Sequence, residues 1–244
     1  QGQLRLMLVA RSLVRKPEVL LLDEVTDGLD ARARNTLLDA LERASELSTL
    51  VMTTHRPETL PSWIGRQIVL ENGKAVDGPM LETAVEPEKE PAPVASAPEL
   101  KGIRGCSARI AIKDASVFID RVPVLYDINW TINPGENWAV LGGNGAGKSM
   151  LLRLLRGEQW PDQIDHRRAG RVLWHGPEGA DPSPLTGRKV TSLVSAMQQE
   201  RVVHQEWRVD GERLVLGGFS DAIYIAQQPT SETVSYTHLR AHET

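Results

Sequence analysis

The sequence has one cysteine, few aromatic residues and no long hydrophobic run. A single thiol, Cys106, cannot form an internal disulfide, and we expect it to be inert in a reducing compartment. No apolar stretch approaches the ~20 residues that a membrane-spanning helix needs, so any membrane role should act through a partner. The net charge of -4 makes a dominant nucleic-acid-binding face unexpected. The remaining composition, 41% hydrophobic and 25% charged, is that of an ordinary soluble globular protein.

A glycine-rich motif in the second half of the chain carries the clearest functional signal. Residues 142–149 read Gly-Gly-Asn-Gly-Ala-Gly-Lys-Ser and fit the P-loop pattern G-x-x-x-x-G-K-[ST] at each fixed position. An apolar run at 138–141 predicts a buried strand before the motif, and residues 150–156 predict a helix after it. Glycines let backbone N–H groups face phosphate oxygens, and the helix N-terminus adds attraction. The alternative, an unrelated glycine turn, does not explain the flanking strand and helix.

The P-loop pattern also assigns individual roles. Lys148 should reach the β- and γ-phosphates of ATP, and the Ser149 hydroxyl should ligate Mg²⁺. The other candidates for nucleotide contact are the remaining loop residues and the residue after the motif: Gly142, Gly143, Asn144, Gly145, Ala146, Gly147 and Met150.

A pair of acids follows a hydrophobic run in the first part of the chain. Residues 19–22 predict a buried strand, and Asp23 and Glu24 come directly after it, at the end of the strand where α/β sheets bind ligands. Asp23 would hold Mg²⁺, directly or through water, and Glu24 would act as a general base on the attacking water. Many strands end in acids, so this pattern alone leaves its function open.

The residues after this pair strengthen the functional interpretation. Asp27-Gly28-Leu29-Asp30 is a turn signal that also caps a helix predicted over 31–47. Residues 49–54 predict the next buried strand, and His55 lies just past its end, where a sensor of the γ-phosphate would be needed. A lone histidine is more often a surface or core residue.

Periodicity and turn signals predict the other elements. We expect a helix over 2–15, a hairpin around Asn72-Gly73, and strands near 108–117, 123–132, 171–174 and 191–196. We expect a loop at 162–168 and a turn-rich insertion at 178–184. The stretch 82–105 is rich in proline, alanine and charge, which predicts a disordered linker.

In this order the motifs resemble those of ATP-binding cassette (ABC) ATPases. Gly2 and Gln3 match the end of the signature motif, and Walker B, the D-loop and the switch histidine follow. The resemblance implies that Gly2, Gln3 and Asp30 contact nucleotide and that Glu24 and His55 are catalytic. Val25 departs from the proline that usually follows the catalytic glutamate.

The second part resembles the opening of a cassette, with two strands and an Asn-Pro-Gly-Glu turn before Walker A. The resemblance makes Phe118 the first candidate for stacking on adenine and Tyr126 the second, although both also fit as core residues. Gln198 or Gln199 would be the Q-loop glutamine that touches Mg²⁺ and water. The local sequence there departs from the family's tyrosine-valine-proline-glutamine.

Paired tryptophans narrow the resemblance, because Trp130 and Trp138 flank the turn as in tandem-cassette ATPases of the molybdate-transport-associated ModF type. From the order of the motifs we expect four regions in the chain. The first section (1–81) is the second half of one cassette, 82–105 is the linker, and the second section (106–233) is the first half of another cassette. Residues 234–244 resemble a translated sequencing adapter. The chain begins at Gln1 in mid-motif, which predicts a fragment.

Two arrangements of these halves are open. In an intact parent, Gly2 and Gln3 would close over ATP held at Lys148, while Asp23, Glu24 and His55 would serve another site. Alternatively, the two halves pack as one circularly permuted pseudo-cassette, which we favour because it buries a shared sheet. Either way, the expected fold is an α/β P-loop NTPase with a mostly parallel sheet, flanking helices and an antiparallel β segment.

The resemblance implies an ATP-hydrolysing subunit that requires ATP and Mg²⁺ and acts at the cytoplasmic face of the inner membrane. It would pair cassettes within the parent chain and couple hydrolysis to solute transport through a separate permease, with molybdate a candidate solute. The alternatives are a soluble tandem ATPase acting on ribosomes or in DNA repair, and a nucleotide-binding module without hydrolysis.

Overall fold

A computed structural model describes the chain in several stretches, residues 2–76, 109–165, 168–176, 179–196, 198 and 211–220. The predicted linker at 82–105 and the predicted tail at 234–244 lie outside these described residues, as do Cys106 and Gln199. Among the helices in the described stretches, none is both long and apolar enough to cross a membrane.

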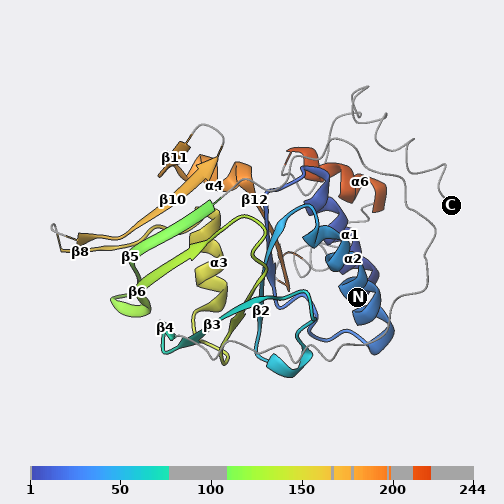
Figure 1. Cartoon of the computed structure of the whole chain (residues 1–244), viewed down its shortest axis with the longest axis horizontal. Helices are drawn as coiled ribbons and strands as arrows, with labels where there is room; N and C mark the ends of the chain where they lie inside the picture. The colour runs from blue at the N-terminus through green and yellow to red at the C-terminus, as the bar shows by residue number, and fades with distance from the viewer. Residues whose placement is uncertain are drawn as a thin grey trace.

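A six-stranded sheet at the centre of the molecule takes strands from both sections (Figure 1). Its order is β12 (Thr191–Ser195), β1 (Val19–Asp23), β2 (Thr49–Thr54), β7 (Trp138–Leu141), β3 (Arg66–Glu71) and β4 (Lys74–Val76). The strands from β12 to β3 are parallel, and β4 returns antiparallel to β3 through the predicted Asn72-Gly73 turn. Because β7 of the second section lies between β2 and β3 of the first, the two sections form one body. The predicted α/β fold with a mostly parallel sheet is confirmed.

A second, antiparallel sheet belongs to the second section alone. Its order is β11 (Gly179–Asp181), β10 (Arg171–Gly176), β5 (Arg109–Ile119) and β6 (Val122–Ile132). The helix α3 (Lys148–Arg156) lies between this sheet and the central one, and α4 (Pro184–Val190) packs beside it (Figure 1). Leucines of α3 therefore share one core with Val19 and Leu21 of β1 and with Ile110 of β5.

The opposite face of the central sheet is covered by α1 (Gly2–Val14), α2 (Ala31–Ser45) and α6 (Gly211–Leu216) (Figure 1). Apolar residues of β1 pack there against Leu8 of α1, Leu37 and Leu41 of α2 and Leu214 of α6. The side chains of β1 alternate between the two faces, so Leu20 and Leu22 face this layer while Val19 and Leu21 face α3. The described residues also include short 3₁₀ turns, η1 (Pro57–Thr59) and η2 (Gly217–Ser220).

Two short stretches differ from the sequence prediction. The expected loop at 162–168 contains β8 (Gln163–Asp165) and β9 (Arg168–Ala169), which pair with each other. The expected turn-rich insertion at 178–184 contains β11 and ends where α4 begins at Pro184. Strands of two or three residues are too short to show an alternating pattern, and α4 is marked only by the Ser183 cap and the proline that follows it.

Polar contacts fasten the two sections together at the edge of the sheet where β7 begins. The side-chain oxygen of Asn137 accepts from the backbone N–H of Leu50 at 2.9 Å, and the Gly135 N–H donates to the Thr49 hydroxyl at 2.8 Å. The Asn137 amide also donates to the Trp63 carbonyl at 3.4 Å. The turn before the P-loop strand therefore fixes the register between β7 and β2.

Glu136 organises the same turn. Its carboxylate accepts from the Asn133 N–H at 3.1 Å and the Trp138 indole at 3.3 Å, and it pairs with the Arg66 guanidinium at 2.9 Å. Burial alone would raise the pKa of the Glu136 carboxyl, but hydrogen bonds from Asn133, the charge of Arg66 and the Trp138 bond together hold the pKa below its ordinary value. The ionised form is therefore the one that stabilises the turn.

Candidate nucleotide-binding and catalytic site

The P-loop runs from the end of β7 to the start of α3. Gly147 caps α3 with a φ of 101°, a left-handed conformation that favours glycine. A Cβ at this position would lie 2.9 Å from both the Leu125 side chain and the Val124 carbonyl of β6. The last glycine of the motif is therefore required by its backbone conformation and by the close approach of β6. The loop also lines a hollow with Leu70, Glu71 and Asn72.

Lys148 is buried at the mouth of this loop, with 5% of its surface exposed. Its Nζ donates to the carbonyls of Gly142 at 2.9 Å and Gly143 at 3.0 Å, and it lies 3.1 Å from Oε1 of Glu24. The lysine of the second section and the predicted catalytic acid of the first therefore form an ion pair in one site.

A set of oxygen atoms lies next to this pair. Oδ1 of Asp23 accepts from the Ser149 hydroxyl at 3.2 Å and from the Thr53 hydroxyl at 2.8 Å. A carboxylate and a serine hydroxyl this close together are the hard oxygen ligands that Mg²⁺ takes beside a nucleotide. The residues present therefore fit the expected ion, with Asp23 from one section and Ser149 from the other.

The acidic loop (residues 23–30) is held in an unusual backbone conformation. Glu24 has a φ of 49°, which costs a non-glycine residue about 1 kcal/mol. Its N–H donates to the Thr53 hydroxyl at 3.0 Å, and its carbonyl accepts from the Asp27 N–H at 3.2 Å and from Nη1 of Arg5 at 3.3 Å. These bonds stabilise the strained backbone and direct the Glu24 carboxylate.

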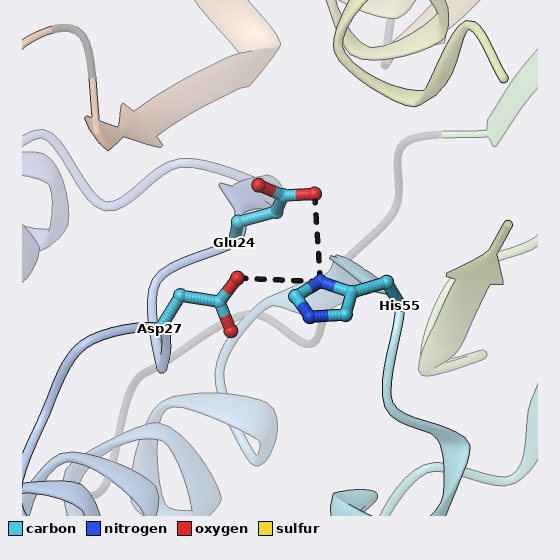
Figure 2. Close-up of side chains that lie close together, drawn as sticks. All are labelled: Glu24, Asp27 and His55. Carbon is cyan, nitrogen blue, oxygen red and sulfur yellow. Dashed lines mark ion pairs between the residues drawn. The ribbon is translucent and has the colours of Figure 1, made fainter. Parts of the chain in front are cut away.

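Two carboxylates of this loop face the same ring nitrogen of His55, Nδ1 (Figure 2). Its Nδ1 is 3.4 Å from Oδ2 of Asp27 and 4.0 Å from Oε1 of Glu24. Its Nε2 accepts from Nε of Arg56 at 3.2 Å. Because Nε2 accepts this bond, the proton of the neutral ring is assigned to Nδ1, facing the two acids.

The residues predicted for the adenine contact and the Q-loop make the following described contacts. The N–H of Phe118 donates to Asp162 at 2.6 Å, whereas that of Tyr126 donates to the Gly73 carbonyl, beside the hairpin that borders the P-loop hollow. Lys74 Nζ lies 5.1 Å from the centre of the Tyr126 ring. The Gln198 side-chain oxygen accepts from the Ser195 N–H at 3.3 Å, and Ser195 is the β12 partner of Asp23. Both assignments remain predictions.

The residues carried over from the signature and D-loop have other described contacts. Asp30 caps α2, accepting from the Ala33 N–H at 2.8 Å, and Gly2 packs closely on Ala33. Gln3 is an exposed residue in the first turn of α1, and Met150 is a half-buried residue of α3 that packs against the core. Their contact with nucleotide therefore also remains a prediction.

Three further residues of the site were not singled out from the sequence as functional. Thr53 has a local signal, because it is a hydroxyl residue near the carboxyl end of a buried strand. Arg5 lies three residues before Leu8, a spacing that places it on the buried side of α1. The sequence around Asp27 is equally typical of an ordinary turn, so it gives no specific signal of function.

Comparisons with known proteins find matches over most of the chain. A family model described as ABC transporter matches residues 125–239, and a model described as an AAA domain matches residues 1–60. The ABC transporter ATP-binding protein ModF of Escherichia coli is 30% identical over 255 aligned positions, which cover 93% of this chain and 48% of ModF. No solved structure matches the chain.

Other relatives cover less of the chain. An uncharacterized ABC transporter ATP-binding protein of Schizosaccharomyces pombe is 31% identical over 64% of this chain and 33% of its own length. The glutathione/L-cysteine transport system ATP-binding/permease protein CydD of Haemophilus influenzae is 43% identical over 31% of this chain and 13% of its own length. The chain thus spans about half of ModF and less of the others. It is an ABC-type ATP-binding protein chain that resembles ModF over most of its length.

Proposed function

We propose that this chain binds Mg-ATP in one site built from both sections and that its parent protein hydrolyses ATP. The observation that carries this proposal is the contact between Ser149 and Asp23 at 3.2 Å, beside the 3.1 Å pair of Lys148 and Glu24. Residues on opposite sides of the predicted linker thus present a lysine, a hydroxyl and two carboxylates to one small volume. That set matches the chemistry of phosphate binding and activation of water.

Each residue has a distinct role in this proposal. ATP supplies the transferable γ-phosphoryl group, and Mg²⁺ would be held by Asp23 and Ser149. Lys148 leaves the Glu24 carboxylate and the loop carbonyls to pair with phosphate oxygens, which frees Glu24 to orient water and accept its proton. His55 presents its Nδ1 proton to the acidic loop and keeps the Glu24 carboxylate in place.

Coupling to transport is the finer part of the proposal. The parent protein would bring two cassettes together at the cytoplasmic face of the inner membrane and drive a separate permease. Molybdate is a candidate solute because the chain resembles the molybdate-transport-associated ModF type and aligns with ModF over 93% of its length. Copurification of a permease with the parent would support this role. ATPase stimulation by ribosomes or DNA would instead support a soluble tandem ATPase.

The deciding measurement is calorimetry of Mg-ATP binding to the chain beside its Lys148→Ala and Asp23→Asn variants. We expect Lys148→Ala to weaken binding about 100-fold, or ~2.7 kcal/mol, and Asp23→Asn to weaken it about tenfold only when Mg²⁺ is present. Lys113→Ala, which alters an exposed lysine of β5, is the control and should leave binding unchanged. Unaltered binding by Asp23→Asn would show that the second section binds nucleotide alone and would refute the shared site.

A further inference from the structure

Arg5 is a buried cation that belongs to none of the nucleotide-binding motifs. It lies on α1 with 8% of its surface exposed, and its Nη1 donates to the Val25 carbonyl at 2.6 Å and to the Glu24 carbonyl at 3.3 Å. Burial lowers the pKa of the guanidinium, while the negative charge of Asp27 opposes that shift. Helix α1, which begins at the predicted end of the signature motif, thus places the Arg5 guanidinium against the acidic loop.

The described bonds to the backbone of Glu24 come from three different places. Thr53 of β2 receives its N–H, Asp27 of the same loop donates to its carbonyl, and Arg5 donates to that carbonyl and to the next one. Thr53 is fixed by the sheet, and the Asp27 bond closes a local turn. Arg5 is therefore the member of this set that ties the loop to a helix.

The position of this backbone determines where two carboxylates lie. Glu24 reaches Lys148 at 3.1 Å, and Asp27, three residues later, reaches Nδ1 of His55 at 3.4 Å. Displacement of the carbonyls of Glu24 and Val25 would move both carboxylates together, because the loop between them is a single turn. A movement of α1 would be transmitted to both carboxylates through the Arg5 guanidinium.

We propose that Arg5 is a positioning residue that holds the acidic loop so that the carboxylates of Glu24 and Asp27 face Nδ1 of His55. It acts through two backbone carbonyls and does not touch nucleotide. Its effect on turnover depends on the ATPase function proposed above, whereas its effect on the loop does not.

The test uses hydrogen exchange and mass spectrometry on the whole chain, with Arg5→Met and Arg5→Lys variants. We expect Arg5→Met to speed amide exchange over residues 24–28 at least tenfold, and Arg5→Lys to speed it less, because lysine still donates but lacks the planar fork. Arg11→Met is the matched control, since Arg11 is a second buried arginine of α1, about 9 Å further along the helix. It should leave exchange over 24–28 unchanged.

Two other measurements separate positioning from general stability and from the proposed function. Mg-ATP affinity should change less than twofold in either Arg5 variant, and where turnover is measurable kcat should fall about tenfold at constant KM. Unchanged exchange over 24–28, or an equal rise throughout α1 and the central sheet, would overturn the proposal. If Arg5→Met does not fold, wild-type exchange in Arg5→Lys would overturn it. A wild-type chain without hydrolysis would count against the proposed function, and the exchange result would still decide the role of Arg5.

Discussion

The P-loop and the acidic loop lie against each other, yet they are held in opposite ways. The P-loop is stabilised mostly by itself, with Lys148 donating to Gly142 and Gly143, and with the Leu151 N–H donating to the Gly147 carbonyl. The acidic loop is held by side chains distant in sequence, among them Arg5 and Thr53. The conformation of the P-loop is therefore set by its own short motif, whereas that of the acidic loop is set by the assembled fold.

This difference has a functional meaning. A loop that holds its own shape can bind phosphate wherever a strand and a helix flank it. The acidic loop presents Asp23 correctly only when β2 lies beside it, and it presents Glu24 correctly only when α1 is also in place. Binding should therefore tolerate damage to the fold better than hydrolysis does.

The largest effect should come from breaking the close approach of the P-loop to β6. Gly147→Ala adds a Cβ 2.9 Å from both the Leu125 side chain and the Val124 carbonyl, at a φ of 101°. We expect a loss of about 3 kcal/mol in the free energy of unfolding, from strain and overlap combined. Gly143→Ala is the control, because a Cβ there meets nothing within 4 Å. Chemical denaturation measures both, and equal stability of the two variants would contradict the contact with β6.

An intermediate effect should come from the acidic loop. Thr53→Val removes the hydroxyl that accepts the Glu24 N–H and donates to Asp23, so we expect a loss of about 2 kcal/mol in stability and about tenfold weaker Mg-ATP binding. Thr49→Val, at the other end of β2, removes the hydroxyl that accepts the Gly135 N–H. It should cost similar stability with unchanged affinity. Equal affinities in the two variants would mean that Thr53 does not support the site.

The smallest effect should appear at the end of β7 opposite the P-loop. The folded-state pKa of Glu136 lies below the unfolded value near 4.5, so its ionised form stabilises the fold above that pH. Glu136→Gln should therefore be about 1 kcal/mol less stable at pH 7, and this difference should disappear as the pH falls through the folded-state pKa. Denaturation curves between pH 3 and pH 7 measure it. A difference that grows toward low pH would contradict the assigned sign, and Mg-ATP affinity at pH 7 should be unaffected.

The elements that could be predicted from the sequence are those whose signals are local. The Asn72-Gly73 turn, the buried strand before Asp23 and the strand-loop-helix around Lys148 each lie where their own residues predict them. The pairing of β8 with β9 could not be predicted, because two or three residues carry no periodicity.

The site could be predicted as a set of residues but only partly as a set of contacts. Lys148, Ser149, Asp23 and Glu24 come from recognisable motifs, and the structure brings them together. The bond from Arg5 to the Val25 carbonyl spans twenty residues and two elements, and no local pattern specifies its partner. Contacts of this kind depend on how α1 packs on β1.

The place of β7 between β2 and β3 has a consequence for how the molecule is made. β2 ends at Thr54 and its neighbour β7 begins at Trp138, so a ribosome adding residues from the N-terminus finishes β2 about 5–15 seconds before its partner exists. When this chain is synthesised by itself, β2 and β3 both have an unpaired edge during that interval, facing the position that β7 will occupy. Premature pairing of β2 with β3 would close the gap that β7 must enter, so the chain has a built-in opportunity to misfold during synthesis. Slowing translation between the two sections should therefore lower the yield of native protein, whereas chaperones that cover open strand edges should restore it.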